Sequence, residues 1–204
     1  SSRTTVTTLT EDEIIEKGIF LGFIQRVEHR LGDVIQVKDE MGVLMTYYRN
    51  NILHTYVIAA MVCRILESHS KVAEEELVTL TTTLCQLFSQ EFFLWQNKTE
   101  LTSQINRTVE YLVSRLMVKK TKAGFLSLSE EQNDHFNLSI VANCIDETIQ
   151  RYGIVLSILQ KEHKISRSTL EKDALTLAKR LSTLHNINGP EFVDKRAQAT
   201  IVNA

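Results

Sequence analysis

The spacing of apolar residues predicts α-helices over most of this chain. Residues 1–10 include five threonines and are expected to be disordered. Thr10 and Glu13 then match a capping box, and apolar residues recur at every fourth position after it. We therefore expect a first helix from residue 11 to about Leu31, followed by a loop or short extended stretch as far as Gly42.

Further helical patterns follow, separated by polar residues and turn signals. Asn97 with Glu100 and Ser168 with Glu171 are the candidate caps of two of these helices. The expected helices span about residues 43–68, 73–96, 97–116, 137–160 and 168–184, with a last short helix starting near Pro190.

Residues 117–128 break the helical pattern. Met117–Lys120 and Phe125–Leu128 flank a Thr-Lys-Ala-Gly turn, an arrangement typical of a small β-hairpin. The predicted fold class is therefore mainly α: a multi-helix bundle of about six to seven helices with one small two-stranded hairpin. Residues 11–204 form the helical region, with 11–116 and 117–204 as two candidate subdomains.

Composition supports this fold class and narrows the function. The 204 residues include one proline and seven glycines, a shortage of helix breakers that favours long helices. The net charge of −2 argues against a dedicated nucleic-acid binder. No run of apolar residues is long enough for a transmembrane helix. Because the sequence lacks an initiator methionine and ends within a helical pattern, we expect it to be a segment of a larger protein.

The common catalytic and metal-binding patterns are absent from the sequence. The three cysteines are far apart, which indicates a reducing compartment and buried thiols. No two of the six histidines have the His-x-x-x-His spacing of ligands on one helix face, so no metal and no cofactor is expected. There is also no Gly-x-Ser-x-Gly motif and no glycine-rich phosphate loop. We expect no catalytic residue in this segment.

Two segments allow a functional interpretation beside a structural one. Gly18–Ile24 is apolar on nearly every side, so a buried helix is favoured and shallow insertion at a membrane interface is the alternative. The lysines Lys119, Lys120 and Lys122 lie on the predicted hairpin. A solvated turn is favoured there, and the alternative is the wing of a winged-helix-like module that binds nucleic acid or protein.

The densest polar cluster precedes an apolar helical run and is too polar to fill a core. An arginine in it could bind a carboxylate or phosphate with a planar fork of donors, and the asparagines could satisfy backbone groups at a helix start. We consider the cluster a candidate inter-domain or substrate-proximal surface, consisting of Tyr47, Tyr48, Arg49, Asn50, Asn51 and His54.

Four segments of the chain occur in the same order in a known family. They are Met45–His54, Glu147–Tyr152, Ser168–Lys172 and Arg180–Lys195. These segments resemble the C-terminal part of the bacterial membrane-bound glycerol-3-phosphate acyltransferases. The resemblance spans about residues 42–196 and implies an enzyme that transfers an acyl group from acyl-CoA or acyl carrier protein to the 1-hydroxyl of glycerol 3-phosphate. The product is lysophosphatidate, an intermediate of phospholipid biosynthesis.

The resemblance also implies where the catalytic residues lie. The family uses a His-x-x-x-x-Asp motif, in which the carboxylate orients the histidine that acts as general base. None of the six histidines of this chain has an aspartate at that spacing. We therefore expect an accessory C-terminal region, inactive alone, that packs on the catalytic domain of the same chain at the cytoplasmic face of the inner membrane. The expected partners are that domain, the membrane surface and the parent's substrates, without nucleic acid.

Overall fold

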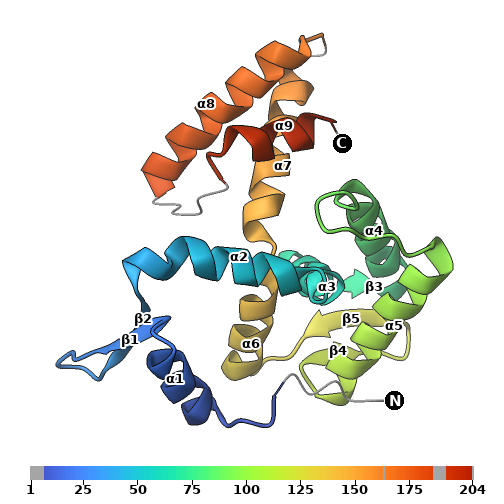
Figure 1. Cartoon of the computed structure of the whole chain (residues 1–204). Helices are drawn as coiled ribbons and strands as arrows, with labels where there is room; N and C mark the ends of the chain where they lie inside the picture. The colour runs from blue at the N-terminus through green and yellow to red at the C-terminus, as the bar shows by residue number, and fades with distance from the viewer. Residues whose placement is uncertain (1–6, 163, 186–191, 204) are drawn as a thin grey trace. The chain divides into compact units, whose positions relative to one another are not determined.

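The computed structural model describes residues 7–162, 164–185 and 192–203 (Figure 1). The predicted mainly helical fold is confirmed, but the described residues form nine α-helices rather than six or seven, and two small sheets rather than one hairpin. In chain order the elements are α1 Glu11–Phe20, β1 Ile24–Val27, β2 Val34–Val37, the 3-10 helix η1 Asp39–Met41, α2 Gly42–Leu53, α3 Val57–Ser68, β3 Val72–Ala73, α4 Glu74–Leu87, α5 Lys98–Ser114, β4 Val118–Lys120, β5 Phe125–Leu128, α6 Gln132–Asn143, α7 Asp146–Lys161, α8 Arg167–His185 and α9 Lys195–Asn203.

The chain divides into two compact units, residues 1–52 and 53–204. Within the second unit, α3 packs against α6, and the candidate boundary at residue 116 lies between these two helices in the sequence. Each unit is described by itself below.

The first unit contains α1 and a β-hairpin. The capping box is confirmed: Thr10 Oγ1 accepts a hydrogen bond from the Glu13 backbone N–H at 3.4 Å, and the Thr10 backbone N–H donates to Glu13 Oε2 at 2.8 Å. These bonds from Thr10 hold the pKa of Glu13 below its usual value. The expected helix to Leu31 is wrong, because α1 ends at Phe20.

A β-hairpin replaces the second half of that expected helix. Gly22 adopts a positive φ of 76°, which turns the chain away from the helix axis. The next residues form β1, which pairs antiparallel with β2, so that Ile24 lies opposite Val37 and Val27 opposite Val34. A Cβ atom at Gly18 would lie 2.7 Å from Ile24 Cδ1, so the missing side chain lets α1 approach β1 closely.

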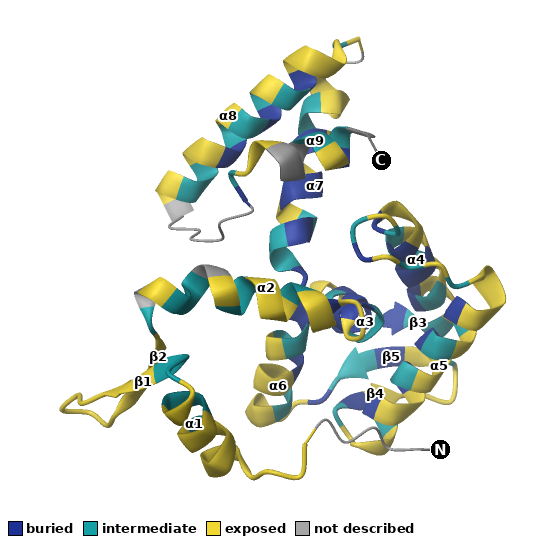
Figure 2. Ribbon diagram, in the orientation of Figure 1, coloured by how far each residue is buried: buried dark blue, intermediate teal, exposed yellow. Residues whose placement is uncertain are grey.

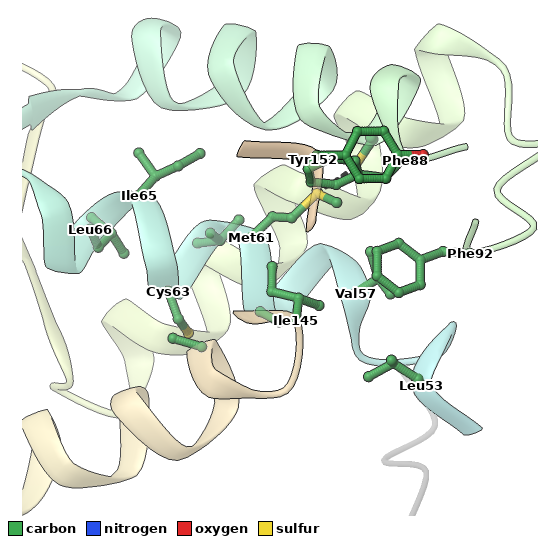
Figure 3. Packing of buried hydrophobic residues seen from close by; sticks show 14 of the residues in the cluster. Leu53, Val57, Met61, Cys63, Ile65, Leu66, Phe88, Phe92, Ile145 and Tyr152 are labelled. Atoms are coloured by element: carbon green, nitrogen blue, oxygen red, sulfur yellow. Dashed lines mark hydrogen bonds between the residues drawn. The ribbon is translucent and has the colours of Figure 1, made fainter. Parts of the chain in front are cut away.

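The core of the second unit is built around α3. This helix is apolar on nearly every side, and accordingly it packs against α4, α5 and α6 at once. Figure 3 shows Met61 of α3 in the middle of the cluster, with Ile145 and the rings of Phe88 and Tyr152 nearby. The largest fully buried side chains of the described residues are Phe88, Phe192, Met61, Leu66, Leu77, Ile105, Leu126, Leu138, Ile145, Val57 and Val62.

A three-stranded antiparallel sheet lies beside these helices. The predicted hairpin is confirmed as β4 and β5, with Lys119 opposite Ser127. The short strand β3, which the sequence pattern did not predict, joins it by pairing Val72 with Leu126, so the strand order is β3-β5-β4. The elements follow one another as α3–β3–α4–α5–β4–β5 with β5 in the middle, an order in keeping with the winged-helix-like alternative expected from the sequence.

Three of the expected long helices are divided or shortened in the structure. Residues 43–68 form α2 and α3, separated by a turn in which the Tyr56 N–H donates to the Leu53 carbonyl at 2.9 Å. The helix expected to reach residue 96 ends at Leu87. Residues 132–161 form α6 and α7 rather than one helix from 137 to 160, and both helices reach the core because of the break.

The last part of the second unit contains α7, α8 and α9, with α7 packed against the other two. Helix α8 buries Leu170, Ala174 and Ala178 at four-residue spacing. The expected cap at Ser168 is wrong: α8 begins one residue earlier, and Ser166 Oγ accepts a hydrogen bond from the Thr169 N–H at 3.2 Å. The expected helix start near Pro190 lies outside the described residues.

The three cysteines should differ in reactivity in the folded protein. Cys63 and Cys85 are buried, as expected, whereas Cys144 is exposed, contrary to expectation. Burial raises the pKa of the Cys63 and Cys85 thiols to about 12. Because the thiolate is the reactive species, we expect a thiol reagent at mildly alkaline pH to label Cys144 alone, and all three cysteines after unfolding in urea. Mass spectrometry of the labelled protein would show this, and rapid native labelling of Cys63 or Cys85 would contradict it.

Candidate functional site

The predicted polar cluster lies on the last turns of α2 and just beyond it. Tyr47 and Tyr48 are exposed on the helix, His54 follows its end, and His54 belongs to the second unit. With 3.6 residues per turn, five consecutive residues point in all directions around the axis. The side chains of Tyr47–Asn51 therefore surround α2 instead of converging on one pocket.

Some side chains of this cluster contact one another and other residues of the first unit. The Tyr47 and Tyr48 rings meet edge to face at 6.0 Å, and Tyr48 also contacts the Phe23 ring at 6.0 Å. Arg49 donates from Nε and Nη2 to Asn50 Oδ1, both at 3.1 Å. The guanidinium of Arg49 is thus held beside the helix surface and stays exposed.

The first unit exposes many apolar side chains. None of the residues 7–52 whose burial is described is buried, and Figure 2 shows no dark blue in this part. The buried helix expected at Gly18–Ile24 is not found: α1 has no buried residue, and Phe20 is 81% exposed. Leu31, in the turn of the hairpin, is 86% exposed. The other large exposed apolar residues of this unit are Leu9, Ile14, Leu21, Val27, Val34, Ile35, Val37, Leu44, Tyr47, Tyr48 and Ile52.

Two lysines of the β4–β5 hairpin form ion pairs with acidic side chains. Lys119 pairs with Glu130 at 2.9 Å and lowers the pKa of that carboxyl, and Lys120 pairs with Glu74 at 2.6 Å. Two of the three lysines of the hairpin are therefore neutralised by acidic partners. A phosphate backbone would have to displace those carboxylates, so the charge pattern favours the solvated-turn interpretation over nucleic-acid binding.

A buried ion pair was missed by the sequence interpretation. Arg151 on α7, whose side chain is 3% exposed, donates from Nη2 to Glu91 Oε1 at 2.5 Å and to Thr148 Oγ1 at 3.3 Å. The neighbouring Tyr152 hydroxyl is buried without a hydrogen-bond partner among the described residues. Burial, and then the charge of Glu91, raise the pKa of Tyr152. The only sequence signal was an arginine within an apolar helical stripe.

The described residues contain no group of three or more histidine, cysteine or acidic side chains able to hold a metal ion. A crevice of about 580 Å³ is lined by two histidines and two glutamates, His69, His135, Glu67 and Glu130. His69 Nδ1 is bonded to the Ile65 carbonyl at 2.9 Å, and His135 Nε2 to the Ser129 carbonyl. Each ring thus has one nitrogen hydrogen-bonded to a backbone oxygen, and among the described residues neither histidine is paired with a carboxylate as a general base would be.

The helices of the second unit also differ in surface charge. Three basic residues share the exposed side of α8, and Figure 2 shows exposed residues along this helix.

No helix among the residues with described structure is long and apolar enough to span a bilayer.

Comparison with known proteins identifies the family. The family model described as glycerol-3-phosphate acyltransferase C-terminal region matches residues 1–204. A glycerol-3-phosphate acyltransferase of Colwellia psychrerythraea is 38% identical over 202 residues, which are 99% of this chain and 25% of the relative. A glycerol-3-phosphate acyltransferase of Pseudoalteromonas atlantica is 30% identical over 191 residues, 94% of this chain and 24% of the relative. The chain thus spans about a quarter of the length of these curated relatives, and it belongs to the glycerol-3-phosphate acyltransferase C-terminal region family.

Proposed function

We propose that this chain is an accessory C-terminal region of a glycerol-3-phosphate 1-O-acyltransferase and packs against the catalytic part of the same protein. The observation that carries the proposal is the first unit, whose apolar side chains, Phe20 and Leu31 above all, have no core of their own among the described residues. Exposed apolar surface of this extent usually marks an interaction site. Three quarters of the length of the relatives lies outside this chain and is available to cover it.

The charge of the first unit favours a protein partner over a membrane for this surface. Residues 7–52 contain eight acidic and five basic residues. A net negative charge is repelled by the anionic lipids that attract interfacial helices. Shallow insertion of Gly18–Ile24 is therefore the less favoured of the two roles.

The parent reaction is part of the same proposal. The enzyme transfers an acyl group from acyl-CoA or acyl carrier protein to glycerol 3-phosphate at the cytoplasmic face of the inner membrane. No histidine of this chain has the spacing of the catalytic motif, so the general base belongs to the other part of the protein. Tyr47–Asn51 and His54 then contact the catalytic domain or lie near the substrate, and Arg49 is the group suited to bind a carboxylate or phosphate.

A triple replacement in the full-length enzyme tests the packing surface. Phe20→Ser/Leu31→Ser/Tyr47→Ser removes three exposed side chains of the first unit. Loss of the contact is expected to misplace catalytic groups, lowering acyltransferase activity roughly tenfold to a hundredfold, and to speed limited proteolysis of the segment. In the isolated 204-residue chain each exposed replacement should change the free energy of unfolding by about 0.5 kcal/mol or less.

The second unit provides a matched control. Trp95→Ser/Leu116→Ser/Tyr111→Ser replaces three side chains of similar size and exposure. This variant is expected to keep activity and resistance to proteolysis. If the first triple variant were as active as the unchanged enzyme, or if the control lost as much activity, the first unit would not be the docking surface.

As an alternative role we propose a winged-helix-like protein-interaction module, in keeping with the strand order β3-β5-β4. The paired lysines of its hairpin disfavour nucleic acid as the ligand. This role is compatible with an accessory region.

A further inference from the structure

Basic charge is concentrated in the last part of the chain. The whole chain has a net charge of −2, but residues 161–204 contain eight basic and five acidic residues. Within α8 the exposed positions 172, 176, 179, 180 and 183 recur with helical spacing. They form one basic face of the helix, defined by Lys172, Thr176, Lys179, Arg180 and Thr183.

Within the described part of the chain, the cations of this basic face lack the acidic partners that several other cations of the second unit have. Elsewhere in the second unit Lys119, Lys120 and Arg167 each lie within 2.9 Å of a carboxylate oxygen. Among the residues that the structure describes, Lys172 and Arg180 have no carboxylate oxygen within the 4.0 Å limit of an ion pair, and neither does Lys179. Unpaired basic groups on one helix face create a local positive potential that an anionic surface can neutralise.

The side chains between the cations are small and already bonded. The hydroxyl groups of Thr176 and Thr183 donate to the carbonyls of Lys172 and Lys179, at 2.8 and 3.0 Å. Short side chains at these two positions leave the longer lysine side chains free to extend. At about 1.5 Å per residue, the face from position 172 to 183 is about 16 Å long.

The opposite side of α8 packs into the core. Leu170, Ala174 and Ala178 are buried, so the helix has no apolar face left to insert into a bilayer. A crevice of about 360 Å³ beside α7 brings Lys161 close to Arg180. The carboxyl groups of Glu162 and Asp173 also line this crevice, so we assign the outer surface of α8, rather than the crevice, as the contact.

We propose that the basic face of α8 docks on an anionic phospholipid surface through charge alone. Protein interfaces are depleted in lysine and centre on aromatic or arginine anchors, whereas this face has two lysines, a single arginine and no aromatic residue. Basic side chains near an anionic leaflet each contribute a similar increment of binding. The proposal rests on the proposed function in one respect, because it gives the membrane contact of the parent enzyme a specific surface.

Vesicle co-sedimentation of the whole 204-residue chain tests this proposal without any measurement of acyl transfer. The unchanged chain is expected to bind phosphatidylcholine vesicles that contain about one-third phosphatidylglycerol, and not pure phosphatidylcholine vesicles. Binding should fall with added salt, because screening weakens surface electrostatics. Lys172→Gln/Lys179→Gln/Arg180→Gln is expected to weaken binding about a hundredfold, since each of three cations contributes roughly fivefold.

A charge-matched control excludes a general effect of net charge. Lys98→Gln/Arg115→Gln/Lys122→Gln removes three exposed cations outside α8 and is expected to bind as the unchanged chain does. Circular dichroism of each variant confirms that it is folded.

Three results would overturn the proposal: no binding of the unchanged chain, equal binding by the α8 variant, or equal loss in the control. Tighter binding of the unchanged chain to soluble poly-glutamate than to the vesicles, at matched charge, would place an acidic protein on this face instead and would also overturn the proposal. None of these results depends on whether the first unit packs on the catalytic part, so the two proposals can fail separately.

Discussion

Replacing Glu91 with alanine is expected to destabilise the second unit by about 3 kcal/mol, the lower end of the range for a broken buried ion pair. The variant would leave the Arg151 guanidinium buried, with only the Thr148 hydroxyl as a hydrogen-bond partner among the described residues. Desolvation of an unpaired charge is the main cost. The side chain of Glu91 is 17% exposed, so water screens the pair in part, and we do not expect the upper end of the range.

A double-mutant cycle measures this interaction. Urea unfolding is compared for the unchanged chain, Glu91→Ala, Arg151→Met and the double variant. Because the double variant contains no unpaired buried charge, it should be more stable than Glu91→Ala alone. If Glu91→Ala cost less than about 1 kcal/mol, the ion pair would be too well solvated to matter for folding.

Replacing Phe88 with alanine is expected to cost about 3–5 kcal/mol. Phe88 is almost fully buried, and its ring meets the rings of Phe92 and Tyr152 at centroid distances of 6.2 and 4.6 Å (Figure 3). The variant loses the transfer free energy of the ring and leaves a cavity into which the surrounding core relaxes only in part. The midpoint of urea unfolding should fall, with little change in its slope.

The control for this cavity lies five residues further along the chain. Phe93 has the same side chain but is 68% exposed, so Phe93→Ala should change the free energy of unfolding by about 0.5 kcal/mol or less. Equal destabilisation by the two replacements would mean that burial does not explain the contribution of Phe88.

Local sequence signals predicted the helical class and the places where some elements begin. The capping pairs Thr10–Glu13 and Asn97–Glu100 both form as expected, because all the bonding groups lie within four residues of each other. The hairpin β4–β5 is likewise a local structure, closed by a four-residue turn with a glycine at positive φ, Gly124. The missing catalytic motif was also a property of the sequence alone.

Contacts between residues far apart in the sequence explain where the spacing of apolar residues gave wrong predictions. Four-residue spacing suggested one helix as far as Leu31, but a left-handed glycine and pairing with β2 make Ile24–Val27 a strand. Strand β3 exists only because Val72 meets Leu126, more than fifty residues away. For the candidate site, the residues of the polar cluster were found from their composition, but their distribution around α2 could not be deduced without the bounds of that helix.

By itself the sequence determined that the chain is mainly helical, contains a small hairpin and lacks the family's catalytic spacing. The tertiary structure alone decided that Arg151 is paired with a residue sixty positions away, and that Lys172, Lys179 and Arg180 of α8 are exposed without acidic partners among the described residues. The physical reason is the range of the interactions. Caps and turns are completed by close neighbours in the chain, whereas burial and ion pairing depend on which distant segments the packed core brings together.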